Sequence, residues 1–80
     1  MIIKGRRGYY EITISGLPDE SFQVQIIDNL PTGQRPIGTK ILDTVTNSES
    51  EAKAVAAEAI AKDSRASTAV IARDINWSQS

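Results

Sequence analysis

Two pairs of neighbouring acids come closest to the spacing of catalytic carboxylates or metal ligands. Asp19 precedes Glu20, and Glu49 lies two residues before Glu51. The chain contains no Cys and no His, which excludes thiolate nucleophiles, imidazole bases and zinc sites built from soft ligands. The first pair lies in a turn, where Asp is common, and the second lies at the start of a predicted helix, where acids are favoured. We therefore expect no catalytic residues, no metal site and no cofactor, and predict that the protein is not an enzyme.

The stretch "KGRRGYY" over 4–10 is the other candidate for chemistry, because it joins three positive charges to two aromatic rings. Lys4, Arg6 and Arg7 could contact phosphates. Tyr9 could stack on a base. The simpler interpretation is a charged guard that keeps a sheet edge from pairing with other chains. Nine basic and ten acidic residues leave a net charge of −1, so no global field attracts nucleic acid. We favour the guard and keep weak, sequence-tolerant nucleic-acid binding as the alternative.

Length and composition indicate one small domain. Eighty residues bury a modest core, and an Ile-rich chain favours strands. No run approaches the ~20 apolar residues of a membrane-spanning helix, and polar residues interrupt any signal-peptide core. We expect a cytoplasmic protein that does not contact a membrane.

Alternation of apolar and polar residues predicts three consecutive strands. The segments 9–15 and 22–28 each place apolar side chains on one face. The segment 37–45 reads as a third strand, with a bulge near 40–43 that reconciles its two phases. Short connections between them predict an antiparallel meander.

A capping box from Ser48 to Glu51, or alternatively from Thr46 to Glu49, begins a helix over roughly residues 47–63. Its apolar stripe is formed by Ala52, Val55, Ala56, Ala59 and Ile60. Ala54, Ala57 and Ala61 lie off this stripe. We expect them on an exposed face, and close approach of a second helix is the alternative.

The segment 67–73 reads as a fourth strand, and Ile75 and Trp77 are expected to cover the end of the core. The predicted fold is a single α+β domain over 1–80, ordered β-β-β-α-β, with 78–80 frayed. A mainly antiparallel four-stranded sheet carries one helix on one face, with strand order 4-1-2-3 or 1-2-3-4. The expected inward residues are Tyr10, Ile12, Ile14, Phe22, Val24, Ile26, Ile41, Val55, Ala59, Ile60 and Val70.

One resemblance concerns this layout. The strands "YYEITIS" and "FQVQIID" resemble the meander of antitoxin domains of the HicB type. The segment from Ser48 to Trp77 is similar to small bacterial domains in which a capped Ala-rich helix precedes a strand. The Pro-Gly-Cys-type turn of such antitoxins is missing, and the resemblance implies the arrangement of elements only.

With a single helix, the second face of the sheet is expected to lie uncovered. Its residues would be Tyr9, Glu11, Thr13, Gln23, Gln25 and Ile27. An uncovered face or unpaired edge suits binding of another protein, or self-association. We predict a small non-catalytic protein-binding module that masks a partner's surface, as inhibitors and antitoxins of phage or mobile-element type do. A homodimeric structural domain is a further alternative.

Overall fold

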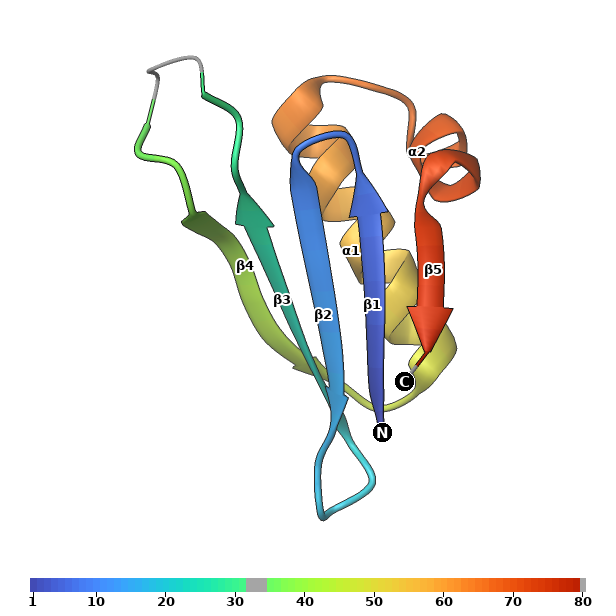
Figure 1. Cartoon of the computed structure of the whole chain (residues 1–80). Coiled ribbons are helices and arrows are strands. Elements are labelled where there is room, and N and C mark those ends of the chain that lie inside the picture. The colour runs from blue at the N-terminus through green and yellow to red at the C-terminus, as the bar shows by residue number, and fades with distance from the viewer. Residues whose placement is uncertain (32–34, 80) are drawn as a thin grey trace.

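Residues 1–31 and 35–79, which the computed structural model describes, form an α+β domain with five strands and two helices. The strands are β1 (Ile2–Arg7), β2 (Tyr10–Gly16), β3 (Phe22–Asp28), β4 (Thr39–Thr46) and β5 (Asn76–Gln79). The helices are α1 (Glu49–Ser64) and α2 (Thr68–Asp74). The sheet is antiparallel throughout with the order β4-β3-β2-β1-β5, and both helices lie behind it in Figure 1.

The predicted meander and its phase are confirmed. Ile12 pairs with Ile26 and Ile14 with Val24, and all four side chains are buried under the helices. The predicted bulge is also present, because Ile26 pairs with Leu42 while Ile27 pairs with Lys40. Ile41 is therefore the extra residue of β4, and both Ile41 and Leu42 pack against the core.

β1 is a strand that the sequence patterns do not predict, so the predicted four-stranded sheet is wrong in number. Its inward positions are Ile3, Gly5 and Arg7, and only Ile3 supplies an apolar side chain. A two-residue connection, Gly8-Tyr9, joins β1 to β2, with Gly8 at a φ of 60°. β1 therefore lies between β2 and the last strand. Neither of the two predicted strand orders has a strand at that place.

The predicted strand over 67–73 is wrong, because this segment forms α2. Ile71 is its buried residue and joins the core, whereas Val70 is 38% exposed instead of inward. The edge of the sheet is taken by β5, which lies antiparallel to β1. The segment predicted to be the last strand is thus a seven-residue helix that packs on α1 and buries one side chain.

The helix start is confirmed. The Ser48 hydroxyl accepts a hydrogen bond from the Glu51 backbone N–H at 3.1 Å, as an N-cap does. The stripe residues Ala52, Ala56 and Ile60 are buried, and Val55 and Ala59 are half-buried.

The expectation that Ala57 and Ala61 are exposed is wrong, and the alternative of a second helix is confirmed. Both residues are buried, and the helix that packs on α1 is α2 of the same chain. Ala54 is exposed, as expected.

The C-terminal segment closes the core as predicted. Ile75 is buried, and Trp77 packs against the core from β5. The ring of Trp77 lies over Gly5 of the paired strand β1, where a Cβ would meet it at 2.7 Å. Lys53 places its Nζ 5.3 Å from the Trp77 ring centroid. β5 extends to Gln79, Ser80 lies outside the described residues, and the fraying of 78–80 stays a prediction.

Neither of the two helices in the described ranges has the length and apolar content that crossing a membrane requires.

Candidate functional site

The sheet has one face that the described chain leaves uncovered, and we call it the outer face. It comprises the outward side chains of Ile2, Lys4, Arg6, Glu11, Thr13, Ser15, Gln23, Gln25, Ile27, Lys40, Asp43, Val45, Asn76 and Ser78. It faces the viewer in Figure 1, with the helices on the other side. Five of the six predicted outer-face residues belong to it, namely Glu11, Thr13, Gln23, Gln25 and Ile27. Tyr9 lies in the β1–β2 turn at the corner of this face and is 55% exposed.

Asp43 orders the half of the outer face that lies over β3 and β4. Its carboxylate accepts hydrogen bonds from the side-chain amides of Gln23 at 3.1 Å and Gln25 at 3.3 Å. Lys40 donates to the same carboxylate at 3.2 Å, across the bulge. The Gln23 bond, followed by those of Gln25 and Lys40, holds the pKa of Asp43 below its ordinary value. The two Gln side chains predicted to meet a partner are thus fixed by an acid on the neighbouring strand.

A second polar group orders the end of the outer face near the β1–β2 turn. Arg6 donates to one oxygen of Glu11 at 2.5 Å, and Asn29 donates to the other at 2.9 Å. Both partners of the ion pair are substantially exposed, so its contribution to stability is small. Its consequence is orientation, because Glu11 fixes the ends of the Arg6 and Asn29 side chains.

The basic residues of the N-terminal stretch do not form one surface. Lys4 and Arg6 lie on the outer face, whereas Arg7 points to the helix side, 3.7 Å from Asp74 of α2. Alternation along a strand separates neighbours in this way. Tyr9 adjoins Arg6 and Glu11 at the corner of the sheet. A site that joins Lys4, Arg6 and Arg7 to Tyr9 would have to reach around this corner.

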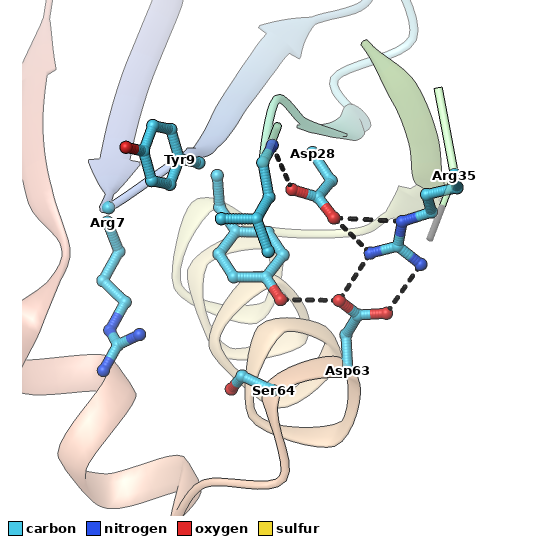
Figure 2. Close-up of a pocket in the computed structure, with 9 residues that line it drawn as sticks. Arg7, Tyr9, Asp28, Arg35, Asp63 and Ser64 are labelled. Carbon is cyan, nitrogen blue, oxygen red and sulfur yellow. Dashed lines mark hydrogen bonds and ion pairs between the residues drawn. The ribbon is translucent and has the colours of Figure 1, made fainter. Parts of the chain in front are cut away.

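A charged cluster that the sequence patterns did not reveal lies at the end of β3 (Figure 2). Arg35 donates from Nε and Nη2 to Asp28, at 3.0 and 2.5 Å. It also donates from Nη1 and Nη2 to the two oxygens of Asp63 in α1, at 3.1 and 2.6 Å. The Tyr10 hydroxyl donates to Asp63 at 2.5 Å, and the Leu30 backbone N–H donates to Asp28 at 2.9 Å. The cluster therefore links the start of β2, the end of β3 and the last turn of α1.

The cluster shifts the pKa of Tyr10, Asp63 and Arg35 in the directions expected for a neutralised network. Burial, then the hydrogen bond to Asp63 and the charges of both acids, raises the pKa of Tyr10 to about 12. The hydrogen bonds from Arg35 lower the pKa of Asp63. The same two aspartates raise the pKa of Arg35 further, so the guanidinium stays charged. The pKa of Tyr10 and that of Asp63 move away from neutral pH, which is where a general acid or base has to exchange its proton.

A hollow of about 520 Å³ lies beside this cluster and is walled by Arg7, Tyr9, Tyr10 and Leu30. Its strongest hydrogen-bonding groups are already satisfied within the chain, because Arg35 donates to both aspartates. Asp28, whose side chain is 6% exposed, would be a costly unpaired charge without Arg35. The geometry assigns this cluster to holding the start of β2, the end of β3 and α1 together.

A weak sequence signal for the cluster existed. Asp28 ends a strand in phase with its buried residues, where a carboxylate needs a partner. Its partner Arg35 lies 7 residues further along the chain, and Asp63, the other acid that Arg35 binds, lies 28 residues beyond Arg35. No local pattern connects such positions.

The two acid pairs considered for catalysis have local partners instead. Asp19 accepts hydrogen bonds from the backbone N–H and the hydroxyl of Ser21, which lower its pKa. Glu49 pairs with Lys53 one helical turn further on, at 3.4 Å. Across residues 1–31 and 35–79, three or more carboxylates do not converge on a point that could hold a metal ion. The absence of a cofactor and of catalysis stays a prediction.

Comparisons with family models, with curated proteins and with solved structures gave no match for this chain.

Proposed function

We propose that the chain is a small, non-catalytic protein-binding module whose binding surface is the outer face of its sheet. By occupying a surface of its partner it acts as an inhibitor, in the style of antitoxins and of inhibitors from phage or mobile elements. One observation carries the proposal: α1 packs on one face of the sheet and α2 packs on α1, so nothing within residues 1–31 and 35–79 covers the other face of the five strands.

The composition of the outer face supports a protein partner. Ile2 and Val45, at opposite edges of one cross-strand row, are 42% and 56% exposed. Between them and the exposed Tyr9 lie the polar groups held by Asp43 and Glu11. Side chains already fixed by hydrogen bonds lose less conformational entropy when a partner binds, so a fixed polar surface favours specific binding.

The face is a better candidate than either sheet edge. β4 presents one edge, but its bulge at Ile41 interrupts the regular row of backbone groups, and Lys40 and Asp43 flank the interruption. Bulges and edge charges are devices that discourage strand addition. β5 presents the other edge over four residues only. A partner that adds a strand therefore has little to pair with.

The proposal of a non-catalytic role rests on how the ionisable groups are used. Asp28 and Asp63 are both bound to Arg35. The acid pairs 19–20 and 49–51 lie in a turn and at a helix start. Ser64 lines the same hollow as the two aspartates that Arg35 binds, but its hydroxyl donates to the Ile60 carbonyl of its own helix instead of to a base.

The test compares partner capture by matched variants in cells of the native host. Tyr9→Ala and Gln25→Arg change the outer face. Glu58→Gln alters charge by the same amount as Gln25→Arg, but on an exposed position of α1 behind the sheet. Circular dichroism first checks that all variants are folded. We expect a specific partner that co-purifies with the wild type and with Glu58→Gln in equal amount, and that both outer-face variants lose.

Three results would contradict the proposal. The first is equal capture by the wild type and both outer-face variants. The second is loss by Glu58→Gln alone, which would move the surface to the helices. The third is a solution mass twice the 8.7 kDa of the chain that falls to one chain on Gln25→Arg, because the outer face would then bind a second copy.

A further inference from the structure

A hollow of about 280 Å³ opens on the outer face over β1, between β2 and β5. Its walls are two cross-strand rows. Lys4 is flanked by Thr13 and Ser78, and Arg6 is flanked by Glu11 and Asn76. Short hydroxyl side chains on both sides of Lys4 leave room beside its long stem. The hollow therefore results from the register of the three strands.

The groups around this hollow are mostly hydrogen-bond donors. Lys4 is exposed, and none of the ion pairs within residues 1–31 and 35–79 involves it. Arg6 shares its charge with Glu11, so two cations and one carboxylate leave a net charge of +1 at the hollow. The hydroxyls of Thr13 and Ser78 and the amide of Asn76 can each donate a further hydrogen bond. One negatively charged group matches this set.

We propose that this hollow receives a carboxylate side chain, Asp or Glu, from an acidic segment of the protein partner. The inference rests on the proposed function, since it names a contact within the outer face. Lys4 supplies the charge, and the hydroxyls and the amide fix the position of the carboxylate. Hydrogen bonds in which the acceptor is ionised are about twice as strong as neutral ones.

The surroundings favour a single carboxylate over the phosphates of a nucleic acid. A polyanion that crosses the outer face from Lys4 would pass Glu11 on one side and Asp43 on the other. Arg7, which would extend the positive surface, lies on the helix side near Asp74. Like charges that face each other across an interface reject the wrong partner.

The test is an NMR titration of the ¹⁵N-labelled protein at low salt with a six-residue peptide that carries one Glu among five Gln residues, called the Glu peptide. A peptide of six Gln residues is the uncharged control. Lys4→Gln removes the charge at the hollow, and Lys62→Gln removes the same charge from an exposed site on α1. We expect the Glu peptide to shift the backbone signals of residues 4–6, 13 and 76–78, and the Gln peptide to leave them unchanged. Lys4→Gln should weaken binding about threefold, and Lys62→Gln should leave it unchanged.

Equal weakening by Lys4→Gln and Lys62→Gln would overturn the inference, because it would reveal only a response to net charge. Shifts confined to other residues, or no binding of the Glu peptide, would overturn it too. Tighter binding of a single-stranded oligonucleotide at the same residues would replace the carboxylate with a phosphate. Each of these results leaves the protein-binding proposal intact if Gln25→Arg still loses the captured partner and Glu58→Gln does not.

Discussion

Gly5→Ala tests the contact that seats the C-terminal strand on the sheet. A Cβ at this position would lie 2.7 Å from Cε3 and Cζ3 of Trp77 and 3.1 Å from Cγ2 of Ile75. Ordinary carbon contacts are about 3.5–4.0 Å, so the Trp77 ring would have to move by roughly 1 Å. Overpacking of this kind costs about 1–3 kcal/mol. Replacing Gly by Ala at a compatible backbone position returns about 0.4–1 kcal/mol. The expected net loss is about 1–2 kcal/mol of the free energy of unfolding.

Urea denaturation followed by circular dichroism measures this loss, with Gly16→Ala as the matched control. At Gly16 an added Cβ would lie 3.7 Å from the Met1 carbonyl oxygen, an ordinary contact, so little change is expected. In a Trp77→Leu background the cost of Gly5→Ala should largely disappear, since the ring that clashes is gone. Equal stability of Gly5→Ala and Gly16→Ala would refute the packing of Trp77 on β1.

Three further outcomes follow from the structure. The pKa of Tyr10 is raised from 10.0 to about 12, so the stability that its protonated hydroxyl contributes is complete below pH 10 and is lost as the pH rises through about 12. Over that range Tyr10→Phe should lose less stability than the wild type. Equal losses in the two proteins would contradict the hydrogen bond to Asp63. Ser48→Ala should cost about 1 kcal/mol in thermal or urea unfolding because it removes the N-cap of α1, and an unchanged stability would show that the cap contributes nothing. Ala57→Leu should lower the free energy of unfolding by about 1–3 kcal/mol, because the larger side chain pushes α2 away from α1. Ala54→Leu, on the exposed side of α1, should leave it nearly unchanged. Similar effects of the two substitutions in urea denaturation would be inconsistent with the helix packing.

Local patterns predicted those parts of the fold in which the chemistry of neighbouring residues decides the structure. Alternation gave β2 and β3 their correct phase, because Ile12, Ile14, Val24 and Ile26 alternate with polar residues and are all buried. The conflict of phase in the third strand predicted the bulge, because Ile41 and Leu42 could not both point inward in a regular strand. The capping box at Ser48 predicted the start of α1.

The errors arose where a distant contact replaces a local signal. β1 has Gly5 at its central inward position because the Trp77 ring fills that space, and a missing side chain leaves no alternation to detect. The Gly8-Tyr9 connection was a usable signal, since Gly at the first position of a two-residue turn is common in hairpins. In α2, two β-branched residues in sequence favoured a strand, but Ile71 is buried against α1 and β5 takes the place at the sheet edge.

The candidate site was also predictable only in part. Most outer-face residues were predictable, because period 2 fixes the outward side chains once the inward ones are known. The fixed orientation of the Gln23 and Gln25 side chains was not predictable, because Asp43 reaches them only when β4 pairs with β3 in the bulged register. The separation of Arg7 from Lys4 and Arg6 follows from β1 being a strand, which was the element missed.

The central claim is that the outer face meets the partner, and site-specific photo-cross-linking tests it most directly. A p-benzoylphenylalanine replaces the exposed Val45 at the β4 side of the outer face in one variant and Glu58 on α1 in another, and both are irradiated in cells of the native host. The account predicts a discrete adduct with one protein partner from position 45 and none from position 58. An adduct from position 58 alone, or none from either position while the wild type still captures its partner, would contradict it.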